Sequence, residues 1–157
     1  MNMLETLGAI LVGLIILAGA ALGLQKAFTG VKLNDTEQNL IVLRMQTQQL
    51  FSGSPGYTGL DNSMALNAGL VPKQFVKGTD LVNPFGGTIT LAASSDASSF
   101  SITLTGVPKE ESTKLATFQS DAWLSVSVNG TDVTGGTVAD IQAACSGSNN
   151  TIIFAAR

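Results

Sequence analysis

The sequence predicts an α+β fold in which one long N-terminal helix precedes a mainly antiparallel β-sheet. Three observations predict this fold. An uncharged apolar run covers residues 6–24, and an amphipathic helical pattern continues from there to residue 51. A cluster of Ser, Gly and Pro at residues 52–56 then ends the helix. Beyond it, short stretches rich in β-branched residues alternate with turn signals, which is typical of hairpins in a small globular head.

The apolar run over residues 6–24 has the length of a membrane span. As a helix it would extend about 28 Å at ~1.5 Å per residue, close to the ~30 Å hydrocarbon core of a bilayer. A cleaved secretory signal fits poorly, because the run is too long and no Lys or Arg occurs in the first 25 residues. We therefore expect this segment to belong to the working protein, with a basic leader already removed.

Glu5 lies at the edge of this run and needs a partner. A carboxylate at mid-bilayer costs roughly 2.5 to 3.5 kcal/mol on insertion scales, so acids there are usually paired. Because no basic side chain lies nearby in the sequence, the expected partner is an α-amino group, either the chain's own or that of a neighbouring molecule.

Glycines in the same run allow close helix packing. Gly19 and Gly23 are small residues four positions apart, and Gly8 and Gly13 precede them. Such glycines let two helix backbones approach closely, and they also weaken a helix that leaves lipid. Glycine is common in membrane helices without any such role, so the pattern alone leaves both interpretations open.

Residues 25–51 continue the helix with an amphipathic pattern. Leu33, Leu40, Leu43 and Leu50 fall on one helical stripe, which predicts that this half packs on the head. The chain therefore divides into a hydrophobic transmembrane half-helix at 1–24, an amphipathic half-helix at 25–51 and a globular head at 52–157.

Within the head, local signals predict short helices and strands. Asp61 or Asn62 begins a short helix that Gly69 closes, and a loop-rich connection follows over residues 70–87. The remaining expected elements are strands at 88–92 and 99–105, a helix at 108–120, a strand at 123–128 ending at the Asn129-Gly130 turn, a helix at 138–144 and a last strand at 151–155. Polar residues alternate along the last two strands, so one sheet face should be solvated or turned to a partner.

The side chains offer little for catalysis or ligand chemistry. There is no histidine, which argues against an enzyme. A formal net charge of −3 with scattered basic residues argues against a nucleic-acid-binding surface. Glu110 and Glu111 are adjacent and suit a helix N-terminus better than a catalytic pair. The single cysteine, Cys145, is expected to be a buried apolar residue rather than a reactive thiol. We expect no cofactor and no metal site.

Four motifs together resemble one known family. The most specific is the start Met1-Asn2-Met3-Leu4-Glu5-Thr6, followed by the apolar helix. The others are Gly69-Leu70-Val71-Pro72, Asn83-Pro84-Phe85-Gly86-Gly87, and Cys145 with the closing strand Thr151-Ile152-Ile153-Phe154. The whole chain resembles a mature type IV pilin of the type IVb class, similar to the pilins of conjugative thin pili and related enterobacterial pili.

The resemblance implies a pilin fold and a role in assembly. In this family a prepilin peptidase removes a basic leader and methylates the new N-terminal residue, here Met1. Glu5 matches the family's acid at the fifth mature position, which implies that it pairs with the methylated amine of a neighbouring subunit. Gly13, Gly19 and Gly23 would supply flexibility and close packing in a filament-core helix.

The function that the resemblance implies is that of a structural subunit, the major pilin, of a homopolymeric pilus used for adhesion or conjugative mating contact. Its partners would be copies of itself, the peptidase and the inner-membrane assembly machinery. The subunit would lie in the bacterial inner membrane before assembly and in an extracellular filament afterwards. A pseudopilin of a type II secretion system and a single-pass membrane-anchored binding module are the alternatives.

Two departures from the family pattern affect this interpretation. Type IVb pilins usually close their C-terminal region with a disulfide, whereas Ser112 and Thr113 stand near the position of its first cysteine and leave Cys145 without a partner. The C-terminal region must then be held by packing alone. Leu22 lies where many type IVa pilins break the apolar helix with a proline.

Overall fold

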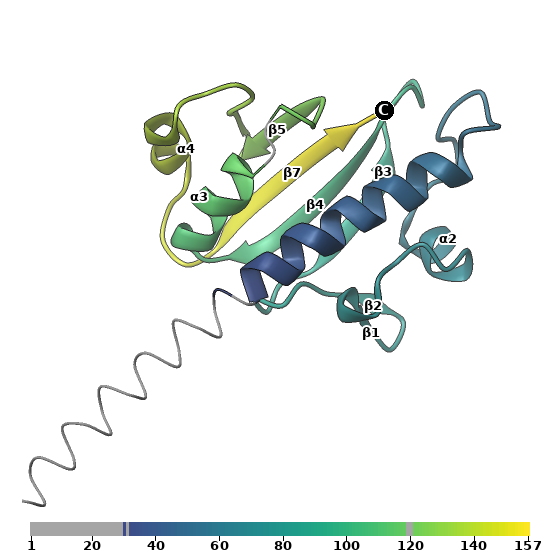
Figure 1. Cartoon of the computed structure of the whole chain (residues 1–157), viewed down its shortest axis with the longest axis horizontal. Helices are drawn as coiled ribbons and strands as arrows, with labels where there is room; N and C mark the ends of the chain where they lie inside the picture. Colours follow the sequence, from purple (N-terminus) through teal and green to yellow (C-terminus); the bar gives the residue numbers. More distant parts are fainter. Residues whose placement is uncertain (1–29, 31, 119–120) are drawn as a thin grey trace, which may run out of the picture. The chain divides into compact units, whose positions relative to one another are not determined.

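The computed structural model describes residues 30, 32–118 and 121–157, and it confirms the predicted α+β fold. A helix over residues 32–50, here called the long helix, packs on an antiparallel sheet (Figure 1). Thr36–Arg157 forms one compact unit, and the packing described below lies within it. The predicted transmembrane half-helix at 1–24 lies outside the described residues.

The inner stripe of the long helix follows a spacing of three and four residues. Thr36, Leu40, Leu43 and Thr47 are each 0% exposed. The Thr47 hydroxyl donates to the carbonyl of Leu43 at 2.7 Å, which satisfies a polar group that burial would otherwise penalise. The prediction that Leu50 belongs to this stripe is wrong. It is 48% exposed, and it is the last residue of the helix, close to the exposed residues 52–55.

The main sheet has five antiparallel strands in the order β3-β4-β7-β5-β6. The C-terminal strand therefore lies in the centre, between β4 and β5. The predicted hairpin of the first two strands is confirmed, and β6 is an addition that pairs with β5 across the Asn129-Gly130 turn. The strands are β3 (Ile89–Ala93), β4 (Phe100–Val107), β5 (Ser125–Val128), β6 (Thr131–Asp132) and β7 (Asn150–Ala156).

The inner face of this sheet forms the core of the head. Across four strands the register aligns Leu91, Ile102, Phe154 and Val126, and each is at most 1% exposed. The long helix and α3 (Lys109–Thr117) lie over this face (Figure 1). Burial of these apolar side chains stabilises the head by about 25 cal/mol per Å² removed from water.

The outer face carries the alternate residues and has a different chemistry. The register aligns Thr90, Thr103, Ile153 and Ser127 on this face, and all of them keep some contact with solvent. The expectation that one sheet face is solvated or turned to a partner agrees with this exposure.

α2 (Asn62–Asn67) begins at Asp61, whose carboxylate accepts the Met64 N–H at 2.8 Å. Of the two predicted caps, Asp61 is therefore the one used. The Asn62 side chain instead bonds to β3, because its Nδ2 donates to the carbonyl of Ile89 at 3.0 Å and its Oδ1 accepts the Leu91 N–H at 2.7 Å. Asn62 thereby occupies backbone groups on the open edge of the sheet.

The connection between α2 and β3 is more ordered than the predicted loop. A 3-10 turn, η1 (Lys73–Phe75), leads into a small hairpin of β1 (Val76–Lys77) and β2 (Asp80–Leu81). Gly78 in the hairpin turn has a φ of 65°, a conformation that glycine adopts without strain. Strands of two residues are too short to leave a periodic pattern in the sequence.

The turn before β3 is built around Asn83, which is 4% exposed. Its Nδ2 donates to the carbonyls of Thr88 at 3.2 Å and Thr105 at 2.7 Å. Its Oδ1 accepts the N–H groups of Phe85 at 3.0 Å and Gly87 at 3.2 Å. A Cβ at Gly87 would lie 1.7 Å from the carbonyl oxygen of Thr105, so only glycine fits there. The Asn83-to-Gly87 motif therefore serves to fold this turn.

Two boundaries in the C-terminal region differ from the prediction by more than one residue. α3 ends at Thr117 rather than at residue 120, and β5 begins at Ser125 rather than at residue 123. Trp123, whose aromatic ring favours a strand, is instead packed before the strand and is 4% exposed. α4 (Val138–Ala144) confirms its prediction and begins with a capping box between Thr137 and Asp140.

Candidate assembly surface

The residues predicted to act in assembly lie outside the described part of the chain. Met1, Glu5, Gly13, Gly19 and Gly23 all precede residue 30, where the description begins. From residue 30 onward, in the described ranges, no helix is long and apolar enough to cross a membrane. The geometry that bears on assembly is therefore that of the long helix and the head.

The outward face of the long helix is uncharged and partly apolar. Val42 is 41% exposed and Met45 is 50% exposed, on the side opposite the buried stripe. Gln38 and Gln49 are also exposed and continue this face at the same three- and four-residue spacing. A shallow hollow of about 270 Å³ adjoins it, lined by Met45 and three polar residues at the end of the helix. Surface helices usually carry charged residues on their solvent-facing side. The outward face of this helix lacks them, so it is suited to contact with another protein molecule.

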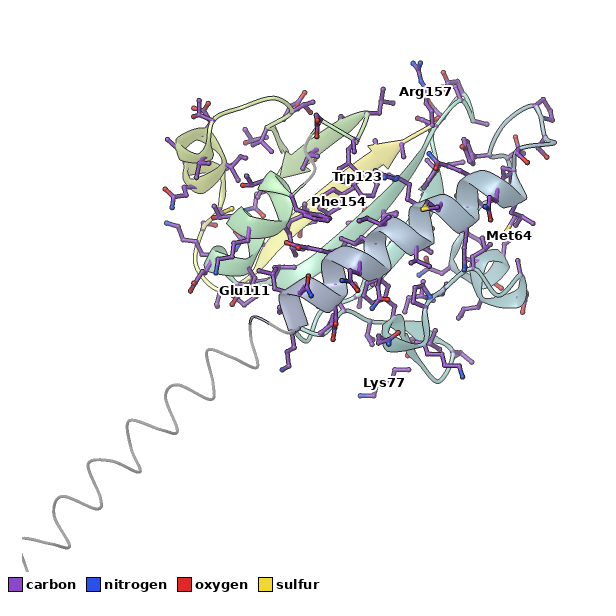
Figure 2. The ribbon with its side chains drawn as sticks, viewed as in Figure 1. Met64, Lys77, Glu111, Trp123, Phe154 and Arg157 are labelled. Carbon is purple, nitrogen blue, oxygen red and sulfur yellow. The ribbon has the colours of Figure 1, made fainter. Side chains whose placement is uncertain are left out.

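Arg44 holds the long helix on the sheet and so fixes the direction of that outward face. Its guanidinium lies 4.6 Å from the centroid of the Trp123 ring, and its Nη1 donates at 3.2 Å to the backbone carbonyl just before the tryptophan. The Trp123 ring packs on Phe154 of β7, with ring centroids 4.8 Å apart (Figure 2). Gln48 Nε2 adds a bond to the carbonyl of Arg157 at 2.6 Å, which ties the helix to the end of the central strand.

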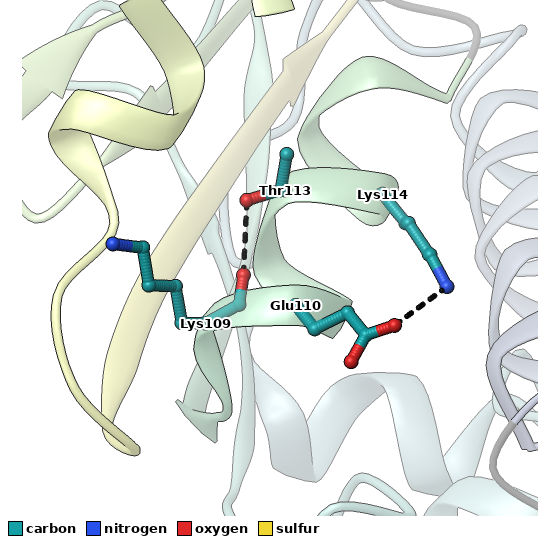
Figure 3. A network of polar contacts seen from close by, with 4 residues as sticks. All are labelled: Lys109, Glu110, Thr113 and Lys114. Carbon is teal, nitrogen blue, oxygen red and sulfur yellow. Dashed lines mark hydrogen bonds and ion pairs between the residues drawn. The ribbon is translucent and has the colours of Figure 1, made fainter. Parts of the chain in front are cut away.

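The carboxylates of α3 do not form a catalytic pair. Glu110 is exposed and pairs with Lys114 at 3.2 Å on the same helix (Figure 3), whereas the adjacent Glu111 is 8% exposed. Lys114 also affects a carboxyl of the long helix, that of Glu37. Burial raises the pKa of Glu37, and the positive charge of Lys114 opposes that shift. Exposed ion pairs of this kind add little stability, so we interpret Glu110–Lys114 as an ordinary ion pair on the helix surface.

Cys145 is buried, as predicted, and its sulfur meets Thr113. The cysteine is 3% exposed at the end of α4, and the Thr113 hydroxyl on α3 lies 3.7 Å from its Sγ. The same hydroxyl donates to the carbonyl of Lys109 at 3.0 Å (Figure 3). Ser112 instead donates to the carbonyl of Val107 at 3.1 Å. Of the two residues near the expected disulfide position, Thr113 is therefore the one that faces Cys145.

Two asparagines hold the C-terminal loop. Asn150 is 0% exposed at the start of β7, and its Nδ2 donates to the carbonyl of Val107 at 2.9 Å. Its Oδ1 accepts the Ser146 N–H at 2.6 Å and the Asn129 Nδ2 at 2.9 Å. Asn129 Nδ2 also donates to the carbonyl of Ala144 at 3.0 Å. These bonds join β4, the β5–β6 turn and the end of α4, so a buried polar network adds to packing where a disulfide is absent.

Two aspartates of the head, Asp132 and Asp140, each accept hydrogen bonds from a nearby threonine. The Thr134 hydroxyl and N–H donate to Asp132, and the Thr137 N–H and hydroxyl donate to Asp140; these hydrogen bonds lower the pKa of both carboxyls. Within the described ranges, no group of three or more His, Cys, Asp or Glu residues could hold a metal ion.

Comparison with known proteins agrees with this geometry. The crystal structure of TcpA, a type IV pilin from Vibrio cholerae El Tor biotype, is similar to this chain with a TM-score of 0.58 and 17% sequence identity. The match covers 80% of this chain and 99% of that chain, so this chain shares the fold of that type IV pilin. A family model described as PilS N terminal matches residues 31–157, and the chain belongs to this family.

The predicted resemblance to type IV pilins of the type IVb class is thereby confirmed. The chain is accordingly a structural subunit of a pilus. No curated protein matches it.

Proposed function

We propose that this chain is the major subunit of a type IVb-like pilus and polymerises with copies of itself. The observation that carries the proposal is the outward face of the long helix, where Val42 and Met45 are exposed although the opposite stripe is fully buried. Arg44 and Gln48 anchor the helix to the head, so this face has a fixed direction. An uncharged, partly apolar second face on an anchored helix suits burial against the helix of a neighbouring subunit.

The N-terminal segment supplies the other half of the proposed assembly. The apolar residues 6–24 hold each subunit in the inner membrane and later pack with their copies in the filament core. Glu5 pairs there with the methylated Met1 amine of a neighbour, after a prepilin peptidase has removed the leader. Gly13, Gly19 and Gly23 allow the helices to pack closely and to bend on leaving lipid. The support is the apolar sequence of this run and its single acid.

The proposed biological role is contact between cells or with surfaces, through conjugative mating or adhesion. The sequence resemblance to the pilins of conjugative thin pili supports it. We expect a structural role with no catalytic step and no cofactor, since the sequence has no histidine and, within the described residues, Glu110 and Glu111 form no catalytic pair.

Filament yield tests the outward face directly. In Val42→Asp and Met45→Asp we expect a strong loss of surface filaments, because each change places a charge on the buried contact. Leu124→Asp is the matched control, since Leu124 is 46% exposed on the head and lies off the helix. Filaments are counted by negative-stain electron microscopy of sheared cell-surface material, and chain abundance is measured by immunoblot. Normal filaments from the Val42 and Met45 variants would refute the role of this face. If the unaltered chain formed only short fibres, that result would favour the pseudopilin alternative.

A further inference from the structure

A cleft of about 710 Å³ opens between α2, the β1–β2 hairpin and the start of β3. In Figure 1 α2 and the β1–β2 hairpin lie below the long helix, and in Figure 2 the labelled Met64 and Lys77 mark α2 and the hairpin. All three elements belong to the unit Thr36–Arg157. The cleft is separate from the outward face of the long helix, with which it shares no lining residue.

Most of the polar side chains of this cleft take no part in holding the fold, although Asn62 and Thr88 do. Within the described residues, five of them make no hydrogen bond or ion pair: Ser63, Asn67, Thr79, Asp80 and Thr90. Two other aspartates of the head differ from Asp80: Asp61 caps α2, and Asp96 accepts hydrogen bonds from its own turn. A carboxylate, an amide and three hydroxyls are therefore free to bond a ligand.

The rest of the lining limits the chemistry of that ligand. Leu66 and Val82 contribute half-buried apolar surface, and the cleft is lined by neither Lys nor Arg. An anionic ligand would meet the Asp80 carboxylate, whereas Lys77, the cross-strand neighbour of Asp80, does not line the cleft. A sugar suits the cleft, because its hydroxyls donate to carboxylate and amide oxygens while its C–H surface packs on aliphatic side chains.

Asn62 argues against a peptide as the ligand. An extended peptide would bind here by adding a strand to the open edge of β3. The Asn62 side chain already occupies the carbonyl of Ile89 and the N–H of Leu91 on that edge. The same two bonds fix α2 against β3, so the cleft keeps its shape and binding needs little ordering of the protein.

We propose that this cleft binds a neutral, hydroxyl-rich saccharide, with Asp80 and Asn67 as its main hydrogen-bonding groups. The site belongs to the single chain and needs no contact with a second subunit. It goes beyond the proposed role in polymerisation and does not depend on it.

The test uses the full-length chain in detergent micelles, labelled with a fluorophore and applied to an array of printed neutral, sialylated and sulfated glycans and unrelated peptides. We expect binding to neutral glycans. The affinity for the best-bound neutral disaccharide should fall about tenfold or more in Asp80→Asn and in Asn67→Ala, the effect of losing one well-placed hydrogen bond. Asp121→Asn and Asn149→Ala make the same chemical changes at exposed positions outside the cleft and should bind normally.

Thermal unfolding of each variant checks its fold, and Thr79→Ala replaces any variant that unfolds early. The proposal is overturned if no neutral glycan binds, if anionic glycans or peptides bind in preference, or if the cleft variants bind as well as the controls. Because the measurement is made on unassembled chains, a negative result here is distinct from a failure of filament assembly.

Discussion

The hydroxyl of Thr113 on α3 lies 3.7 Å from the sulfur of Cys145 at the end of α4. These two side chains join the helices that flank the C-terminal part of the sheet, and they do so without a covalent bond. Asn150 supplies the second connection, through bonds to Val107 and Ser146. The C-terminal region is thus held by one buried contact and one buried polar network rather than by a disulfide.

Thr113→Cys should form a disulfide with Cys145, because the two side chains already face each other across the helix contact. A cross-link of this loop length is expected to raise the free energy of unfolding by about 2 to 4 kcal/mol. Thiol titration and non-reducing mass spectrometry detect the bond, and thermal unfolding with and without reductant measures its effect. Thr117→Cys, one turn further along α3, is the control and should leave two free thiols. Two free thiols in oxidised Thr113→Cys would contradict the geometry.

Asn150→Ala should destabilise the head by about 2 to 4 kcal/mol, because it leaves the carbonyl of Val107 and the N–H of Ser146 without their partner. Asn149→Ala changes the exposed neighbouring asparagine and should cost less than about 0.5 kcal/mol. Urea unfolding of both variants gives the difference. Equal stability of the two variants would show that the buried network contributes nothing.

Gly87→Ala should destabilise the head by about 3 kcal/mol or prevent folding, because the added Cβ would lie 1.7 Å from the carbonyl oxygen of Thr105. Gly53→Ala is the control, since a Cβ there meets nothing within 4 Å. Circular dichroism during heating compares the two. An unchanged unfolding midpoint for Gly87→Ala would mean that the turn before β3 is not as close to β4 as described.

Ser94→Ala should raise the pKa of Asp96. Hydrogen bonds from the Ser94 hydroxyl first, then from the Ser98 hydroxyl and N–H, lower that pKa from 3.8 to about 2. Because the folded pKa lies below the ordinary value, the turn's contribution to stability is complete above pH 3.8 and is lost as the pH falls through about 2.

The carboxyl chemical shift of Asp96, followed by NMR during a pH titration, measures this change. Ser95→Ala is the matched control, since Ser95 is exposed and makes no hydrogen bond within the described residues. The same pKa in both variants would exclude the Ser94 bond as the cause.

Local chemistry made much of the fold predictable. Asp61 could be identified as a candidate cap, and the β3–β4 hairpin could be placed, because each depends on residues close in the sequence. Other features depend on distant residues. The central place of β7 is set by packing between β4 and β5 and leaves no local signal. Thr47 belongs to the buried stripe because the Leu43 carbonyl accepts its hydroxyl, which an apolar pattern does not reveal.

The candidate surfaces were only partly predictable. The spacing of Val42 and Met45 is visible in the sequence, but their exposure follows from which side of the helix the head covers. The saccharide cleft combines α2, the β1–β2 hairpin and β3, and no spacing in the sequence places Asn67 near Asp80. The glycines at 86 and 87 belong to a turn that the Asn83 side chain organises, which explains the motif in structural terms.

The central claim is that Glu5 directs polymerisation of a pilus subunit, and the assembly of Glu5→Val tests it most directly. Negative-stain electron microscopy of sheared surface material should show no long filaments, while membrane fractionation shows normal amounts of the inserted chain. Glu110→Val removes an exposed carboxylate from α3 and should leave filaments unaffected. Abundant filaments of normal length from Glu5→Val would contradict the account.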